Sequence, residues 1–392
     1  MRGARRSGAT RTVRSRNGRG RQTMTWENVG RVAGLLAEEG LDWVVLSSFD
    51  DVCFATGRVV GIETGPSPFA GGPTLALVGR DASHGIVASN VEGIQSEGTA
   101  YEAYEGFSLA VTDQTGNYVA ALDRLLARLG VSGRVGVKAS LPAIVADRLP
   151  TGTRRIGPAL DRLRAVKTAA EIARLTRCGE VAAAGQERAR EASRPGKTEV
   201  GVLNEIRARM ETLAEARCAL AGEYMAGSDR TARLGLPVSA HPVSAGDPVI
   251  CDLAPRVEGY WGDSCGAFVV GAHASEAYLT MWRAARDALA LAEAELRPGM
   301  RVSDFDRTIR DFMAGRGRSC PHHTGHGIGA SVHEWPRLVP GEDALIERDM
   351  VLMVEPGCYE PGIGGVRCEF MLRVTETGCE NLTPFTMEPV LA

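Results

Sequence analysis

The sequence predicts an α/β domain at the amino terminus, followed by an α+β domain built from a duplicated unit of two helices and a β-hairpin. Three observations support this fold class. Strand and helix patterns alternate up to about residue 155. A helical motif recurs at an offset of 103 residues, and a strand pair carrying acidic residues follows each copy. The length of 392 residues also favours two domains.

The composition is that of a globular chain with a sizeable core. Hydrophobic residues make up 44% of the chain and the formal net charge is −3, so the overall charge gives no case for binding nucleic acid or a membrane surface. No apolar run approaches the roughly 20 residues of a membrane span. Nine cysteines without CxxC spacing indicate reduced thiols and a cytoplasmic protein.

Residues 1–23 differ in composition from the remainder of the chain, with eight arginines and no acidic residue. The expectation is a disordered basic tail, and the alternative is an arm that binds nucleic acid or a membrane surface. Nucleic-acid binding through this tail would weaken steeply with salt and would disappear when residues 1–23 are deleted.

The predicted amino-terminal domain spans residues 24–155. Its first helix runs from Thr25 to about Gly40, where a helix is expected to stop. The apolar segments LDWVVLSS, GGPTLALVG, SHGIVASN and GRVGVKAS are expected as short strands, and GNYVAALDRLLARLG as a helix among them. This order of elements predicts a small α/β domain.

The second predicted domain, residues 160–392, begins with a long helix at which Thr168 and Glu171 have capping-box spacing. A second helix is expected from about Thr198 to Ala216. Its segment RPGKTEVGVLNEIRARM is echoed 103 residues later by RPGMRVSDFDRTIRDFM. Because an Ala/Glu-rich helix precedes each copy and strands follow it, we predict an internal duplication.

Each predicted hairpin brings two acidic residues together. In the first, Asp252 and Asp263 lie nearly opposite each other if the turn centres on RVEG, and directly opposed side chains are about 5 Å apart. In the second, Glu355 follows Asp252 by 103 residues, and Glu369 lies beyond the turn CYEPGIGG. Four carboxylates among apolar strands are costly to bury without cations, and the alternative is a solvated sheet face.

The stretch CPHHTGHGIGASVHEWPRL, residues 320–338, supplies histidines to such a site. His326 is flanked by glycines that permit a close approach of the backbone. One imidazole with four carboxylates suits two divalent ions, Mn²⁺ or Co²⁺, with Fe²⁺ and Zn²⁺ as alternatives. Two such ions activate a water for attack on an amide. His333 would then hydrogen-bond the substrate, whereas His322 and His323 are expected as bystanders or as residues behind the ligands.

Five residues occur in the order found in the pita-bread metallopeptidases, namely Asp252, Asp263, His326, Glu355 and Glu369. That superfamily includes Xaa-Pro aminopeptidases, prolidases, methionine aminopeptidases and the metal-free creatinases. The segments TGHGIGASVHEWP and VEPGCYEPGIGGVRCE resemble its proline-specific branch. The resemblance covers residues 160–392, and the amino-terminal domain fits the same branch. It implies the pseudo-twofold pita-bread fold and a metal-dependent hydrolase.

The resemblance also implies a role for each residue. The implied ligands are Asp252 for one metal ion, Asp263 and Glu369 as bridges between both ions, and His326 with Glu355 for the other ion. Glu355 would also handle the proton of the attacking water, and His333 would contact the substrate near the scissile bond. Arg367 would orient a carboxylate from behind the ligands. The substrate would be a small peptide or another small molecule, and the family resemblance implies a homodimer.

Several positions depart from the proline-specific pattern. Those enzymes usually carry a histidine where this chain has Gly235, 17 residues before Asp252. His241, 11 residues before Asp252, is the candidate catalytic residue that would reach the site from a shifted loop. The segment 264–266, together with Ala254 and Phe370, also differs. These changes are expected to affect the substrate side and to leave the metal ions alone.

Three functions are consistent with the sequence. The leading hypothesis is a dinuclear hydrolase of the Xaa-Pro aminopeptidase or dipeptidase type. The alternative is a creatinase-like or ectoine-hydrolase-like enzyme, or a related lyase, that acts on a small non-peptide metabolite; Gly235 and segment 264–266 support it. The third is a non-catalytic binding module, and the intact set of five ligands argues against it.

Overall fold

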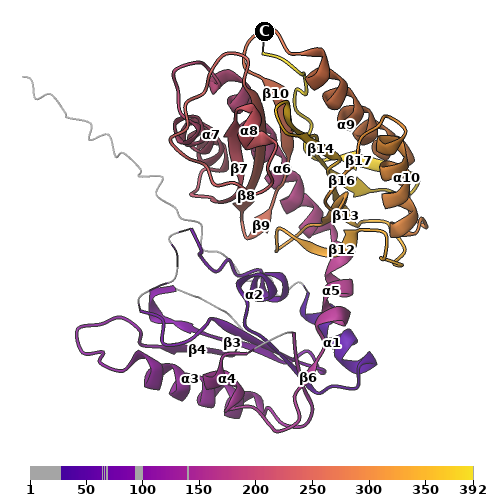
Figure 1. Cartoon of the computed structure of the whole chain (residues 1–392). Coiled ribbons are helices and arrows are strands. Elements are labelled where there is room, and N and C mark those ends of the chain that lie inside the picture. Colours follow the sequence, from indigo (N-terminus) through magenta and orange to yellow (C-terminus); the bar gives the residue numbers. More distant parts are fainter. Residues whose placement is uncertain are drawn as a thin grey trace, which may run out of the picture.

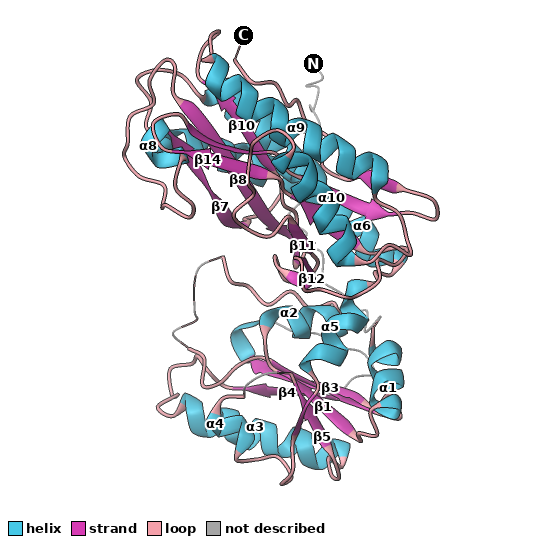
Figure 2. Ribbon diagram, turned by 45° about the vertical axis from the view of Figure 1, so that its right-hand side comes forward, coloured by secondary structure: helices cyan, strands magenta, loops and turns pink. Residues whose placement is uncertain are grey.

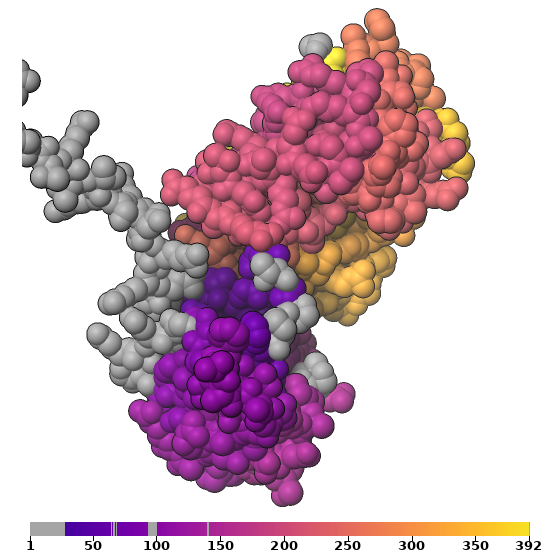
Figure 3. Space-filling view, turned by 90° about the vertical axis from the view of Figure 1, so that its left-hand side faces the viewer, coloured from indigo at the N-terminus to yellow at the C-terminus, as the bar shows by residue number. Residues whose placement is uncertain are grey.

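The computed structural model describes residues 28–63, 65, 67, 69–92, 100–138 and 141–391. The predicted basic tail, residues 1–23, lies outside them, as do the first residues of the helix expected from Thr25. The chain forms two domains, the first below the second in Figure 1. In Figure 3 the indigo surface of the first domain meets the orange surface of the second. Among the helices that the structure describes, none combines the length and the hydropathy needed to cross a membrane.

The amino-terminal domain is a six-stranded sheet between two layers of helices (Figure 2). The strand order is β4-β3-β2-β1-β5-β6. The strands are β1 (Trp43–Leu46), β2 (Leu75–Gly79), β3 (His84–Ser89), β4 (Ala100–Tyr104), β5 (Val135–Val137) and β6 (Arg154–Arg155). One face packs on α1 (Val29–Glu38), α2 (Phe49–Thr56) and α5 (Gly157–Ala165). The other face packs on α3 (Gln114–Leu129) and α4 (Ala143–Ala146).

The sequence patterns missed α2, although its ends carry ordinary signals. The Ser48 hydroxyl accepts a hydrogen bond from the Asp51 amide at the start of the helix, and Gly57 ends it with a φ of 67°. Eight residues are too few for helical periodicity to stand out. This short helix places Asp50 and Asp51 at the boundary between the domains, where both carboxylates accept hydrogen bonds from Arg164.

The second domain contains two helix pairs that cover two antiparallel sheets. The helices are α6 (Ala169–Ala192), α7 (Glu199–Ala214), the short α8 (Ser228–Thr231), α9 (Glu276–Glu295) and α10 (Val302–Ala314). The first sheet holds β7 (Ala219–Ala226), β8 (Pro248–Val257), β9 (Tyr260–Trp261) and β10 (Cys265–Val269). The second holds β11 (Gly325–Gly327), β12 (Glu334–Leu338), β13 (Val351–Val354), β16 (Phe370–Val374) and β17 (Cys379–Asn381). The strands β14 (Gly357–Glu360) and β15 (Gly364–Arg367) form a separate hairpin.

The backbone repeats at the offset of 103 residues that the sequence predicted. The repeated contacts are the hydrogen bonds Gly196 N to Val243 O and Gly299 N to Ile346 O, and the β-bridges Thr198–Pro242 and Arg301–Leu345. The predicted capping box at Thr168 and Glu171 is also present at the start of α6. The duplication therefore brings the strand that carries Asp252 and the strand that leads to Glu355 into equivalent positions in the two halves of the domain.

Candidate metal centre

The first hairpin places Asp252, Asp263 and Cys265 on one side of its sheet. Its turn is formed by Glu258 and Gly259, whose φ values of 50° and 85° are both positive, as in a type I′ turn. This turn lies one residue further along the chain than the sequence predicts. As a result Cys265, rather than Asp263, is the cross-strand partner of Asp252. Asp263 is displaced by two residues and becomes a diagonal neighbour of Asp252.

This register corrects one expectation. The segment 264–266 was expected to affect only the substrate side, yet the Cys265 thiol is fully buried. Its sulfur lies within 4.8 Å of carboxylate oxygens of Asp252 and Glu369. A signal for this arrangement was present in the sequence, because glycine at position 259 suits a type I′ turn and a turn there aligns Cys265 with Asp252.

The second hairpin places Glu355 and Glu369 at the ends of two paired strands. Val354 pairs with Phe370, so Glu355 directly follows β13 and Glu369 directly precedes β16. Between them the chain forms the β14–β15 hairpin, where the sequence suggested only a turn. The Glu369 amide donates a hydrogen bond of 2.9 Å to the Cys265 carbonyl, and this contact joins the two duplicated hairpins at the acidic residues.

The acidic residues and His326 form one compact cluster. Asp263, His326 and Glu369 each offer a ligand atom within 4.8 Å of the others, and Asp252, Cys265 and Glu369 form a second such group. Glu369 therefore belongs to both groups. Glu355 is also close, because its Oε1 lies 3.8 Å from the His326 Nε2 atom. The structure thus brings together all five residues that the sequence predicted as ligands.

His326 is oriented by its strand. Its Nδ1 lies 2.8 Å from the Gly327 carbonyl oxygen, so that nitrogen donates its proton there and Nε2 faces the carboxylates. A side chain at Gly325 would meet the Met353 carbonyl at 1.9 Å, and one at Gly327 would meet the Trp335 carbonyl at 2.5 Å. The two glycines are therefore required for β11 to lie between its neighbouring strands.

Burial and mutual repulsion disfavour the charged forms of three of these acids. Burial, followed by the charges of Asp252 and Glu355, raises the pKa of Asp263 well above its usual value. Burial and the nearby Asp263 do the same to the pKa of Glu369, and burial raises the pKa of Glu355 to about 8. Divalent cations bound among these carboxylates would stabilise their charged forms, so the cluster is suited to holding such ions.

The metal-free protein is expected to become less stable as the pH rises from about 6.5 to 8, because below about pH 6.5 the partly buried, neutral His322 and His323 act in the opposite direction. The pKa of Glu355 is about 8 in the folded protein and near 4.3 when unfolded, so the folded state keeps a proton that the unfolded state releases. Urea unfolding with a chelator present, at intervals from about pH 6.5 to 8, should show a falling midpoint. Divalent ions should remove this slope, and a midpoint that rises with pH would contradict the explanation.

Arg367 lies directly behind the cluster. It is buried, and it donates hydrogen bonds to the Asp252 carboxylate and, over 3.5 Å, to Glu223. Its Nη1 also lies 3.2 Å from the Tyr359 hydroxyl. Glu223 is the β7 partner of Asp252, and no pattern in the sequence pointed to it. Arg367 therefore fixes the orientation of Asp252, and Glu223 helps to hold Arg367.

Three further histidines surround Glu355 and His326. The His323 Nε2 atom lies 3.4 Å from Glu355 Oε1, and His322 Nδ1 lies 3.9 Å from Glu355 Oε2. Burial lowers the pKa of both rings to about 4, so both are neutral at physiological pH. His333 is exposed, with its ring centroid 4.2 Å from that of His326. His322 and His323 therefore lie against the cluster and are not bystanders.

The structure does not bring His241 to the cluster. Gly235 lies on an exposed loop, and a side chain placed at Gly227 would meet the His241 Nε2 atom at 3.3 Å. Gly227 comes four residues after Glu223, the partner of Asp252, which corresponds to about 13 Å along a strand. The backbone of His241 is held by α7, because its carbonyl accepts a hydrogen bond from the Glu199 amide. The proposed catalytic role of His241 gains no support from this position.

The turn that carries His333 is held by a buried charge network that the sequence did not reveal. Glu334 accepts a 3.0 Å hydrogen bond from the Ser331 amide, and its carboxylate also contacts Arg164 and Lys167. Burial would raise the pKa of Glu334, but Arg164 and Lys167 lower it to about 2. Arg164 continues into the first domain, where it donates hydrogen bonds to the two aspartates of α2, Asp50 at 2.9 Å and Asp51 at 2.6 Å.

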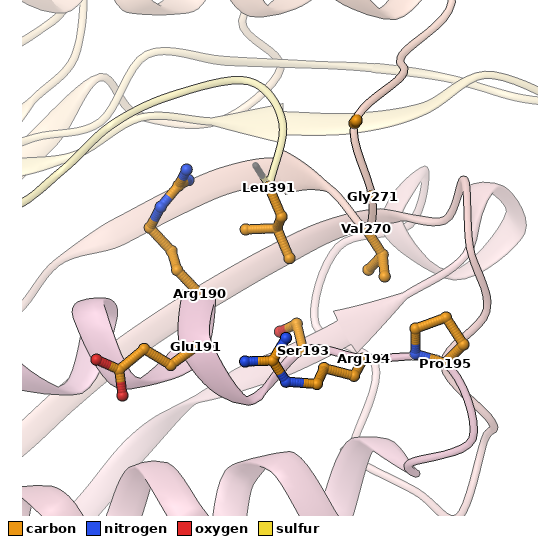
Figure 4. Close-up of a pocket in the computed structure, with 9 residues that line it drawn as sticks. Arg190, Glu191, Ser193, Arg194, Pro195, Val270, Gly271 and Leu391 are labelled. Atoms are coloured by element: carbon orange, nitrogen blue, oxygen red, sulfur yellow. The ribbon is translucent and has the colours of Figure 1, made fainter.

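A separate cavity of about 430 Å³ lies elsewhere in the second domain (Figure 4). It is lined by Arg190, Glu191, Ser193, Arg194, Pro195, Val270, Gly271, Ala272 and Leu391. The Arg190 guanidinium already donates hydrogen bonds to the Glu388 and Val390 carbonyls. This lining contains no histidine, no cysteine and no pair of carboxylates. The carboxylate cluster is therefore the stronger candidate for the functional site.

Comparisons with known proteins identify relatives of this chain. A family model for metallopeptidase family M24 matches residues 173–376. An uncharacterized peptidase of Bacillus subtilis, YqhT, is 28% identical over 92% of this chain and 99% of its own length. A Xaa-Pro dipeptidase of Pyrococcus horikoshii is 26% identical over 88% of this chain and 95% of its own length.

Solved structures show the same fold. A dipeptidase from Pyrococcus horikoshii superposes with a TM-score of 0.80 at 21% identity, covering 93% of this chain and 100% of its own. A prolidase from Pyrococcus furiosus superposes with a TM-score of 0.74 at 22% identity, covering 90% and 99%. The predicted pita-bread fold with an α/β amino-terminal domain is confirmed, and so is the prediction of a metal-dependent hydrolase. The chain belongs to metallopeptidase family M24.

Proposed function

We propose that this metallopeptidase uses two divalent ions and cleaves peptides at Xaa-Pro bonds, with dipeptides as preferred substrates. The observation that carries the proposal is the pair of three-residue ligand groups that share Glu369. A carboxylate with two oxygens in two adjacent groups is suited to bridging two ions. Relatives described as Xaa-Pro dipeptidases, at 26% and 30% identity, support the substrate class.

The donor atoms fit divalent cations. The ligands would be Asp252, Asp263, His326, Glu355 and Glu369, which combine carboxylate oxygens with one imidazole nitrogen. When bound, two such ions supply positive charge that acidifies a water and polarises the scissile carbonyl. Mn²⁺ and Co²⁺ suit this oxygen-rich set. The homodimer and the cytoplasmic location stay predictions from the sequence.

Glu355 is the proposed proton carrier. Its carboxylate lies in contact with His326 and His323, inside the cluster but within reach of a substrate bound over it. In the proposed reaction Glu355 takes a proton from the attacking water and delivers it to the nitrogen of the leaving proline. The second proton of the same water follows to that nitrogen as the tetrahedral intermediate collapses, so the water oxygen ends on the carboxylate and both of its protons end on the protonated amine.

His333 is the proposed contact to the scissile bond. Its ring is partly exposed beside His326 and has no hydrogen-bond partner among the residues that the structure describes. Burial lowers the pKa of His333, and the nearby Arg337 acts in the same direction. A neutral imidazole with a free N–H can donate to the substrate carbonyl as negative charge develops on its oxygen.

Arg337 is the proposed anchor for the substrate carboxylate. It is exposed on β12 as the direct partner of His326, and directly paired side chains share a face of the sheet. The described part of the structure provides Arg337 with no carboxylate partner. A free guanidinium beside the cluster suits the terminal carboxylate of a dipeptide, whose proline nitrogen would then lie over the acids.

A hydrolysis assay tests this function. Xaa-Pro dipeptides should be cleaved after the addition of Mn²⁺ or Co²⁺, and a chelator should abolish cleavage. Amidation of the dipeptide's carboxyl terminus should lower kcat/KM by at least about tenfold, because it removes a charge-assisted hydrogen bond. Absence of turnover of every Xaa-Pro compound by protein that contains two ions would overturn the substrate class. Cleavage of a small non-peptide metabolite under these conditions would favour a creatinase-like reaction.

A further inference from the structure

Cys265 occupies an unexpected position in the cluster. It is the cross-strand partner of Asp252, and its backbone forms a β-bridge with Glu369. Both contacts direct its side chain to the face of the sheet that carries the acids. The sulfur and the two carboxylates lie within 4.8 Å of one another, and the residue has 0% exposure.

The thiol has no other evident structural role. Several other buried cysteines donate to backbone carbonyls, as Cys178 does to Tyr260 at 3.3 Å and Cys53 to Gly259 at 3.6 Å. Within the described ranges the Cys265 thiol makes no hydrogen bond, although the backbone carbonyl of the residue accepts one from Glu369. Met225 and Ile250 share its small buried apolar cluster, with Leu236 and Tyr359 packed against it, but this packing does not account for a sulfur atom directed at two carboxylates.

The spacing is close to that of a shared coordination sphere. Sulfur lies about 2.3 Å from Zn²⁺ and carboxylate oxygen about 2.0–2.2 Å, so a sulfur and an oxygen at a tetrahedral angle on one ion are about 3.6 Å apart. The three atoms lie within 4.8 Å of one another, so each sulfur–oxygen pair is at most about 1.2 Å further apart than in such a site. Small side-chain rotations would therefore bring Asp252, Cys265 and Glu369 onto one ion.

We propose that the Cys265 thiolate binds the ion held by Asp252 and Glu369, and that this position consequently favours Zn²⁺, Co²⁺ or Fe²⁺ over Mn²⁺. The proposal rests on the two-ion function above and deepens it. The second ion position, with Asp263 and His326, contains no sulfur. Thiolate ligands select softer metals, whereas carboxylates suit Mn²⁺, so the two positions differ in metal preference. Binding releases the thiol proton to the solvent, and no oxidation occurs.

Titration of the metal-free full chain with Co²⁺, without oxygen, tests the proposal. Cobalt gives visible d–d bands with any ligands, and a separate near-ultraviolet sulfur-to-cobalt charge-transfer band only when a thiolate binds. The wild-type chain should show both, and Cys265→Ser should keep the d–d bands and lose the charge-transfer band. Its Zn²⁺ dissociation constant should rise at least about 10-fold, the lower end of the effect of losing an outer-sphere partner, with little change for Mn²⁺.

Cys368→Ser is the matched control. Cys368 is equally buried and adjoins Glu369 in sequence, but its side chain packs in the apolar cluster beneath α9, so this variant should keep the charge-transfer band. A wild-type spectrum with d–d bands alone would overturn the thiolate proposal and leave the two-ion function standing. Failure of the wild-type chain to bind cobalt at all would overturn both. Because a wild-type spectrum without the charge-transfer band overturns the proposal by itself, the proposal stays testable even if Cys265→Ser folds poorly.

Discussion

Replacing Glu369 with glutamine is expected to lower peptide hydrolysis by at least about a thousandfold, a loss of about 4 kcal/mol of transition-state stabilisation, while making the metal-free protein more stable. Glu369 belongs to both ligand groups, so its loss weakens both ion positions together. A glutamine can offer one carbonyl oxygen to one ion, but it cannot bridge two ions with a negative charge. The variant should therefore bind at most one ion per chain.

The gain in stability follows from the cost of the buried charge. Burial and the charge of Asp263 raise the pKa of Glu369 well above its usual value, so ionising it in the metal-free fold is unfavourable. A neutral amide of the same shape removes that cost, so the metal-free variant should be more stable than the wild type at pH 8. Because glutamine does not titrate, the fall in stability with rising pH should also become shallower.

Metal content per chain and urea unfolding in a chelator test these opposite effects. The control is Glu376→Gln, which should change neither the metal content nor the unfolding midpoint. The Glu376 side chain is 85% exposed, and its contact with an exposed arginine is long, at 4.0 Å. The explanation is wrong if Glu369→Gln still holds two ions. It is also wrong if the variant loses stability when no metal is present.

The repeat in the sequence explains how much of the site could be predicted. A constant offset of 103 residues relates the strand of Asp252 to the strand that leads to Glu355, and backbone hydrogen bonds recur at the same offset. Because equivalent hydrogen bonds produce equivalent strands, the acids of both hairpins could be expected at one place. The apolar residues around these acids also predicted that the place where they meet is buried.

The parts that escaped prediction depend on register and on distant contacts. A shift of the turn by one residue made Cys265 the partner of Asp252, and alternation of polar and apolar residues cannot detect such a shift when both faces of the strands are buried. Arg164 meets Asp50 across 114 positions and Glu334 across 170. No local pattern records such pairs, since each charged residue alone resembles a surface residue.

Replacing Arg164 with methionine is expected to destabilise the protein by about 3–5 kcal/mol, because it leaves buried carboxylates without their main cation. Arg164 has 2% exposure and donates hydrogen bonds to Asp50, Asp51, Ser331 and Glu334. Lys138 and Lys167 contact parts of this network, but neither reaches all of it. Lysine at position 164 should rescue little, because a single ammonium cannot replace a guanidinium that uses two nitrogens in different directions.

The pH dependence identifies the cause of this loss. Burial would raise the pKa of Glu334, but Arg164 and Lys167 lower it to about 2, and Arg164 likewise overcomes burial to lower the pKa of Asp50. A lowered pKa contributes stability that is complete above the unfolded value, near 4 for both acids, and is lost as the pH falls toward 2. The difference in unfolding free energy between wild type and Arg164→Met should therefore shrink over this range.

Urea unfolding from pH 7 to pH 2.5 measures that difference, with Arg188→Met as the control. Arg188 pairs with Glu191 and Glu205 at the surface, so its loss should leave the unfolding midpoint nearly unchanged. A deficit in Arg164→Met that persists undiminished at pH 2.5 would assign the effect to packing instead of charge. Because the same network holds the Ser331–Glu334 turn that carries His333, folded Arg164→Met at neutral pH should also hydrolyse its substrate more slowly, which links the contact between the domains to the reaction.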